Sequence, residues 1–220
     1  MRKTVLITGA SAGIGAATAR LLAANNYDVA IGYNSDCAGA EAVARDVENA
    51  GGKALLLQAN VGKPEEIEQM FNTLDQAMPR LDALVNNAGI VDAKERGEDF
   101  SAARLQTMFA VNVVGAILVA RNAVRRMSTD LGGNGGTIVN ISSAAARLAS
   151  ANQYVDYAAS KAAIDTFTKG LAEEVATCGI RVNAVRPGVI ETDIHAKGGE
   201  PNRVARIAPL VPMQRAGTAD

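Results

Sequence analysis

The sequence contains few of the residues that build metal centres and disulfide frameworks. Its 220 residues include a single histidine, His195, and two cysteines, Cys37 and Cys178, none of which stands close to other ligand-type residues. A structural zinc site usually takes four Cys or His ligands, and a disulfide framework takes several pairs of cysteines. We therefore expect a reduced chain without a metal centre.

Neither sign of charge is in excess. The chain has 22 Lys and Arg against 23 Asp and Glu, a net charge of −1, and these residues are scattered along it. There is no basic stripe for nucleic acid and no polybasic segment for a membrane surface. We expect neither a signal peptide nor an apolar run of membrane-spanning length. The composition favours a soluble, cytoplasmic protein with no nucleic-acid or membrane partner.

The hydrophobic residues, 48% of the chain, follow an alternating pattern that indicates one α/β domain over residues 1–220. Short, mostly apolar runs predict strands at 4–8, 28–33, 54–58, 83–86, 136–141 and 180–185. Apolar spacing of three to four residues predicts helices at 14–25, 38–50, 64–78, 102–127 and 154–177. Strands that alternate with helices indicate a doubly wound parallel sheet, covered on both faces, with its ligand crevice at the carboxyl ends of the strands.

A glycine-rich turn follows the first predicted strand and opens the first predicted helix. Gly9, Gly13 and Gly15 stand in the segment TGASAGIG. Glycine lets the backbone approach a pyrophosphate, which then lies on the free N–H groups of the helix N-terminus. A turn that only packs helix on strand is the alternative interpretation, but the strand–turn–helix context favours phosphate binding.

Two residues of the last predicted helix suggest a site for proton transfer. Tyr157 stands four residues before Lys161, on the same helix face, and fourteen residues after Ser143. A free phenol has a pKa near 10, and we expect the neighbouring ammonium to lower it. A hydroxyl such as that of Ser143 could polarise a carbonyl oxygen that the tyrosine protonates.

These motifs together resemble the short-chain dehydrogenase/reductase family. The resemblance covers residues 4 to about 195 and includes Asn86-Asn87-Ala88-Gly89, Asn112 and Pro187-Gly188 besides the segments above. It extends loosely to 3-oxoacyl-thioester reductases and sugar dehydrogenases. It implies a Rossmann-type fold, a nicotinamide cofactor, and reversible hydride transfer between that cofactor and a small-molecule carbonyl compound or secondary alcohol.

The resemblance implies four catalytic residues. Tyr157 would be the general acid/base, Lys161 would lower its pKa and bind the nicotinamide ribose, and Ser143 would hold the substrate oxygen. Ser142 competes with Ser143, but the family pattern favours the second serine. Asn112 would help hold a water in the proton relay.

The resemblance and the strand ends also imply a set of cofactor contacts. Ile190 and Thr192 would orient the nicotinamide carboxamide, in a substrate loop at about 188–212. His195 lies in this loop, where we expect a solvated side chain and assign it no role. The predicted cofactor-binding residues are Gly9, Ser11, Gly13, Ile14, Gly15, Asn34, Ser35, Asn60, Val61, Asn87, Ala88, Gly89, Tyr157, Lys161, Pro187, Gly188, Ile190 and Thr192.

The end of the second strand favours NADP(H) over NAD(H). An acid about 20 residues beyond the glycine turn would bind the adenine ribose diol of NAD, but Asn34 and Ser35 stand there and Asp36 comes late. This leaves room for a 2′-phosphate. Against NADP, Ala12 stands where many NADP-using relatives have a basic residue. Asn60 also replaces the aspartate usually found before Val61, where the adenine ring binds, but an amide can still hydrogen-bond there.

The C-terminus suggests an incomplete version of a longer domain. Thr218 resembles a helix N-cap, yet only two residues follow it. Family members usually add a helix and a seventh strand, so we expect the edge of strand 180–185 to be bare. A homodimer through helices 102–127 and 154–177 is expected, and a tetramer would need the missing part. A nicotinamide-nucleotide-binding sensor or subunit without turnover is the alternative function.

Overall fold

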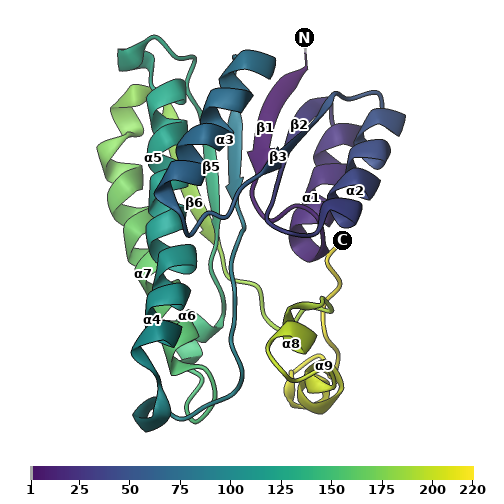
Figure 1. Ribbon diagram of the computed structural model, residues 1–220, viewed down its shortest axis with the longest axis vertical. Helices are drawn as coiled ribbons and strands as arrows, with labels where there is room; N and C mark the ends of the chain where they lie inside the picture. Colours follow the sequence, from purple (N-terminus) through teal and green to yellow (C-terminus); the bar gives the residue numbers. More distant parts are fainter. Residues whose placement is uncertain (1) are drawn as a thin grey trace.

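The computed structural model describes residues 2–220 as a three-layer α/β structure, which confirms the predicted doubly wound sheet (Figure 1). The six strands are all parallel and lie in the order β3-β2-β1-β4-β5-β6. Their bounds are Lys3–Ile7 for β1, Tyr27–Tyr33 for β2, Ala54–Gln58 for β3, Ala83–Asn86 for β4, Gly136–Ile141 for β5 and Ile180–Val185 for β6. The strand order reverses between β1 and β4, the position where doubly wound sheets bind their ligands.

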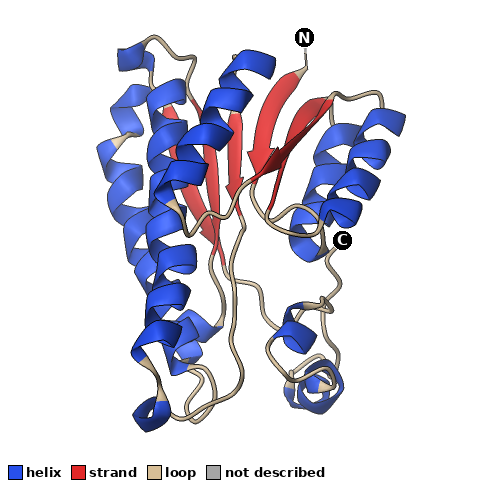
Figure 2. Cartoon of the chain, in the orientation of Figure 1, coloured by secondary structure: helices blue, strands red, loops and turns tan. Residues whose placement is uncertain are grey.

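Two helices cover one face of the sheet, and a group of longer helices covers the other (Figure 2). Helices α1 (Gly13–Ala24) and α2 (Cys37–Asn49) pack on β1 to β3. The opposite face carries α3 (Pro64–Ala77), α4 (Ala102–Phe109), α5 (Ala116–Met127) and α7 (Val155–Glu174). Four short helical segments also lie before β6: Gly97–Asp99, Thr129–Leu131, α6 (Ala145–Leu148) and Ala176–Cys178.

The predicted helix over 102–127 is continuous but not uniform. A π-helical turn, Ala110–Gly115, separates α4 from α5. The prediction that no apolar segment reaches membrane-spanning length was wrong, because this helix is long and apolar enough by composition alone. However, 44% of its most apolar window is buried inside the protein. Val119, Ala123 and Met127 of α5 belong to the core between the sheet and α3, so the helix is apolar because it packs on both.

The sheet is not fully covered on the face that carries α1 and α2. On β5 and β6, the residues that point to this face are half-buried or exposed: Thr137, Val139, Ile141, Arg181, Asn183 and Val185. The prediction of helices over both faces is therefore wrong for this corner. Among residues 2–220, β6 pairs only with β5, so its other edge is bare, as predicted.

The chain after β6 turns away from the sheet and forms a separate group of short helices. These are α8 (Ile194–Lys197), α9 (Arg203–Ile207) and Ala208–Leu210 (Figure 1). Within 195–220 only His195, Gly198 and Ala216 are buried. The segment returns to its own start, because Gly217 forms a β-bridge with Ile190.

Candidate active site

The glycine turn between β1 and α1 has a conformation that side chains would obstruct. Gly9 and Gly13 have positive φ angles of 65° and 52°, in the left-handed region that glycine tolerates. A Cβ atom on Gly15 would collide with the Gly9 carbonyl oxygen and lie 2.7 Å from the Asn87 amide nitrogen. All three glycines are therefore required by the close packing of this turn.

Asn87, at the carboxyl end of β4, holds the turn in place. Its amide nitrogen donates to the carbonyl oxygens of Thr8 and Gly9, at 2.9 and 3.0 Å. The Thr8 hydroxyl accepts from the backbone N–H groups of Asn87 and Ala88, both at 3.0 Å. Both amide hydrogens of Asn87 are thus used within the protein, and its predicted cofactor contact can come only from its carbonyl oxygen or its backbone.

The N-terminus of α1 fits a pyrophosphate. Ala12 is its N-cap residue and provides no side-chain cap, and the first turn has no acidic residue. The first N–H groups of the helix therefore lack side-chain acceptors, and the helix dipole favours an anion there. Thr192 from the loop after β6 closes this corner, since a Cβ on Gly13 would lie 3.1 Å from the Thr192 methyl group.

Replacing Gly15 by alanine should weaken nicotinamide-nucleotide binding at least about tenfold and destabilise the fold by roughly 1–3 kcal/mol, because the added methyl displaces the turn. Gly170→Ala is the matched control. Gly170 is exposed in α7, and its Cβ would meet nothing within 4 Å, so this change should stabilise the helix by up to about 1 kcal/mol. Cofactor titration and urea unfolding of both variants test this. Equal cofactor affinity in the two variants would contradict it.

The second strand end places Asn34 and Ser35 beside the start of α2. Asp36 is the N-cap of α2, and its carboxylate accepts from the Gly39 backbone N–H at 3.0 Å. The only acid in this segment is therefore directed at the helix that it caps. Asn60, after β3, uses its carbonyl oxygen on the Gly62 N–H at 2.9 Å, which leaves its amide N–H groups for a ligand.

Lys161 and Asn112 lie close together, next to Gly89. The Lys161 ammonium is buried and donates to the Ile141 carbonyl at 2.8 Å, and burial lowers its pKa to about 8. Asn112, in the π-helical turn, exchanges two hydrogen bonds with the backbone of Ile90, at 2.8 and 2.9 Å. A Cβ on Gly89 would lie 3.2 Å from Lys161 Nζ and 3.3 Å from Asn112 Oδ1, so the three residues meet at one point.

Ser143 and Tyr157 face each other at the carboxyl edge of the sheet. Burial raises the pKa of the Tyr157 phenol above its ordinary value, whereas a hydrogen bond with Ser143 and the positive charge of Arg203 act to lower it. Ser142, the rejected alternative, is buried and donates its hydroxyl to the Lys161 carbonyl at 3.1 Å. The structure therefore brings Ser143, and not Ser142, to the tyrosine.

The expectation that Lys161 lowers the pKa of Tyr157 was wrong for this structure. The Lys161 ammonium lies 5.7 Å from the centre of the Tyr157 ring and points to a backbone carbonyl, not to the phenol oxygen. Burial acts on both groups, and it disfavours the charged form of each. The phenol is consequently neutral at pH 7 and can donate a proton.

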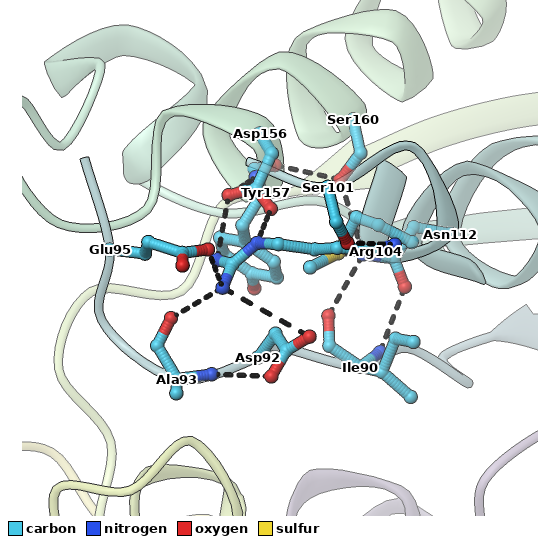
Figure 3. A network of polar contacts seen from close by, with 11 residues as sticks. Ile90, Asp92, Ala93, Glu95, Ser101, Arg104, Asn112, Asp156, Tyr157 and Ser160 are labelled. Atoms are coloured by element: carbon cyan, nitrogen blue, oxygen red, sulfur yellow. Dashed lines mark hydrogen bonds and ion pairs between the residues drawn. The ribbon is translucent and has the colours of Figure 1, made fainter. Parts of the chain in front are cut away.

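A buried ion pair next to Tyr157 was missed by the sequence reasoning (Figure 3). Arg104 of α4 donates from Nε to Asp156 at 2.7 Å, and both side chains are nearly or fully buried. The guanidinium also donates to the Ala93 carbonyl at 2.8 Å and to Glu95 at 3.2 Å. Asp156 in turn accepts from the backbone N–H of Tyr157 at 2.9 Å. The pair thus ties α4, the 93–95 segment and the first turn of α7 together.

The predicted loop after β6 meets the segment after β4. A Cβ on Gly198 would lie 2.9 Å from the Val91 side chain, so the two segments pack tightly there. His195, expected to be a solvated loop residue, is instead buried on α8 and forms a 2.9 Å hydrogen bond between Nε2 and the Ile190 carbonyl. It fixes the backbone of Ile190, one of the predicted cofactor contacts. Pro187 accepts from the Ala144 N–H at 2.9 Å, and Gly188 stands in open space.

The family of this chain follows from comparison with known proteins. The model of the short chain dehydrogenase family matches residues 3–202. The chain is 51% identical over 215 residues to the uncharacterized oxidoreductase YgfF of Escherichia coli, covering 98% of this chain and 87% of that protein. It is 37% identical over 224 residues to 3beta-hydroxysteroid dehydrogenase 1 of Eggerthella lenta, covering 99% of this chain and 82% of that one.

Solved structures agree with this result. A short chain dehydrogenase from Burkholderia cenocepacia in complex with NADP superposes with a TM-score of 0.90 at 34% identity, over 99% of this chain and 86% of that one. A 3-ketoacyl-(acyl-carrier-protein) reductase from Brucella melitensis complexed with NADH superposes with a TM-score of 0.89 at 30% identity, with the same coverage.

The sheet order, the glycine turn and the uncapped α1 define a Rossmann-type dinucleotide-binding domain. The chain belongs to the short-chain dehydrogenase/reductase family. It is therefore an oxidoreductase that acts on CH–OH or C=O groups with a nicotinamide cofactor.

Proposed function

We propose that this chain interconverts a small carbonyl compound and the matching secondary alcohol with NADP(H), through Ser143, Tyr157, Lys161 and Asn112. The observation that supports this proposal best is the buried Lys161 ammonium, which lies 5.7 Å from the centre of the Tyr157 ring and donates to the Ile141 carbonyl at 2.8 Å. When bound, the nicotinamide supplies or accepts the hydride. The protein supplies the proton and holds the reacting oxygen.

Each side chain has one task in this scheme. Ser143 hydrogen-bonds the substrate oxygen, and the neutral Tyr157 phenol donates its proton to that oxygen during reduction. In oxidation the proton returns to the same phenol. With a pKa of about 8, the Lys161 ammonium remains mostly charged at pH 7, and in this scheme it binds the nicotinamide ribose. Asn112 fixes Ile90 and bonds the Ser160 hydroxyl at 3.1 Å, which donates to the Tyr157 carbonyl at 2.7 Å.

A panel of ketones, aldehydes and secondary alcohols, assayed with both cofactors, tests this proposal. Turnover of at least one pair, dependent on a nicotinamide cofactor, is the expected result. Cofactor binding without turnover of any compound would contradict it and would favour a sensor or subunit that binds the nucleotide without catalysis.

We further propose that NADP(H) is preferred over NAD(H). No carboxylate extends from the end of β2 toward an adenine ribose, since Asp36 is held on the N-terminus of α2. Asn34 and Ser35 carry no negative charge. Their amide and hydroxyl groups can donate hydrogen bonds to the oxygens of a 2′-phosphate. The solved relatives include complexes with NADP and with NADH, so they support nicotinamide binding in general.

Asn34→Asp should reverse the order of cofactor affinity, because a carboxylate repels the 2′-phosphate and accepts hydrogen bonds from a ribose diol. We expect NADPH to bind more tightly than NADH to the unchanged protein, and less tightly to the variant. Asn134→Asp, an exposed position in the loop before β5, adds the same charge away from the carboxyl edge and should leave the order unchanged. Fluorescence titration of both reduced cofactors decides it. Tighter binding of NADH to the unchanged protein would refute the preference.

A further inference from the structure

Arg203, the first residue of α9, lies at the side of the proposed active site. Its guanidinium stacks over the Tyr154 ring, with Cζ 4.7 Å from the ring centre. Tyr154 is the N-cap of α7 and stands three residues before Tyr157, so both tyrosines belong to the start of one helix. The Arg203 side chain is only 21% exposed. Most of the Arg203 side chain is therefore buried, close to the helix end that carries Tyr157.

The hydrogen-bonding capacity of Arg203 is not used within the described residues. Its Nε atom is buried and has no hydrogen-bond partner among residues 2–220. The nearest carboxylate, that of Glu200, is 3.8 Å away, which is too far for a hydrogen bond. Glu200 instead accepts twice from Arg206 at 2.9 Å and once from the Tyr154 hydroxyl at 3.0 Å. The guanidinium thus makes one long ion pair and no hydrogen bond within residues 2–220, so it has donors to offer to a further acceptor.

The charged side chains that act on Glu200 are all positive. Burial would raise the pKa of Glu200, but the Tyr154 hydroxyl and the charges of Arg206, Arg203 and Lys94 hold it below its ordinary value. Three cations therefore act on one carboxylate. The acids of the facing segment, Asp92 and Glu95, both contact the Arg104 guanidinium together with Asp156.

We propose that the substrate carries a carboxylate in addition to its carbonyl or carbinol group, and that Arg203 binds this carboxylate. The planar guanidinium fits a carboxylate with two parallel hydrogen bonds, which its two terminal amino groups can donate. The substrate class is then the oxo acids and the corresponding hydroxy acids. This inference depends on the proposed oxidoreductase activity, since Arg203 would orient the substrate toward Tyr157.

Matched acid and ester pairs test the inference with the full-length chain. The probes are 4-oxopentanoate with its methyl ester and 4-formylbenzoate with its methyl ester, together with neutral cyclohexanone, each with NADPH and NADH. Hydrogen bonds to charged groups are strong enough for an acid-over-ester ratio in kcat/KM of about 10- to 100-fold. Arg203→Met should bring this ratio close to one.

Two further variants separate recognition from general electrostatics. Arg206→Met removes a cation from the same helix, but this side chain is 48% exposed and already bonded to Glu200, so the ratio should stay high. Glu200→Gln removes the competing carboxylate while keeping an acceptor for Tyr154, and it should increase the ratio. A role of Arg203 in folding alone would not produce these opposite changes.

The outcomes distinguish this inference from the proposed activity. Reduction of the esters or of cyclohexanone without preference for the acids would overturn the carboxylate proposal and leave the oxidoreductase intact. Equal losses of the ratio in Arg203→Met and Arg206→Met would also overturn it. If no carbonyl compound is reduced with either cofactor, the proposed activity itself fails, and the carboxylate site fails with it.

Discussion

Replacing Tyr157 by phenylalanine should lower kcat by about 10²–10⁴-fold, the usual contribution of a general acid/base. The ring remains, so the packing of α7 and the affinity for the cofactor should change little. Only the phenol oxygen that faces Ser143 is removed. Steady-state rates with the best substrate of the panel, together with cofactor titration, provide the measurement.

Tyr27→Phe is the matched control for that variant. Tyr27 begins β2, at the opposite end of the sheet from the carboxyl edges, and loses the same oxygen atom. Its variant should keep full activity. Near-normal turnover in Tyr157→Phe would remove the tyrosine from the proposed mechanism, whatever the behaviour of the control.

Breaking the Arg104–Asp156 pair should cost about 3–5 kcal/mol of unfolding free energy, because either single change leaves a buried charge without its partner. That is a large share of the stability of a typical domain, about 5–15 kcal/mol. Arg104→Met and Asp156→Leu are the two single variants, and urea unfolding is the measurement. Activity should fall as well, since Asp156 holds the backbone N–H of Tyr157.

The double variant Arg104→Met/Asp156→Leu should recover much of the lost stability, because no buried charge remains. Arg20→Met is the control for an ion pair at the surface, since Arg20 and Asp46 are 48% and 45% exposed. It should change stability little. If the double variant instead lost the sum of the two single losses in unfolding free energy, the two side chains would act independently and the prediction would be wrong.

The strands and the nucleotide-binding turn could be predicted because their signals are local. Apolar runs and glycines placed the six strands within about one residue of their observed bounds. The position of Ser143 opposite Tyr157 could be predicted only through the family pattern. Ser143 follows β5 and Tyr157 lies in α7, so their proximity depends on how these two elements pack and not on any spacing along the sequence.

The ion pair next to Tyr157 could not be predicted in the same way. Asp156 and Arg104 are 52 residues apart, and each looks like an ordinary surface residue of a helix. Their burial results from the packing of α4 on α7. His195 was misjudged for the same reason, since its environment is created by the return of the chain over Ile190. The acid directly before Tyr157 in the sequence was the one signal that could have pointed to this ion pair.

Because of the π-helical turn at Ala110–Gly115, the packing of the helix over 102–127 depends on its number of residues as much as on its composition. A π turn holds one residue more than an α turn, and one residue corresponds to about 100° of rotation. The extra residue lets α4 face α7 while α5 faces α3 and β4. Deleting any single residue between 110 and 115 would rotate Arg104 away from Asp156 or Val119 away from the sheet. This helix should therefore tolerate many substitutions. An insertion or deletion within it would instead rotate α4 relative to α5, so that the contacts of α4 with α7 and those of α5 with the core could not both form.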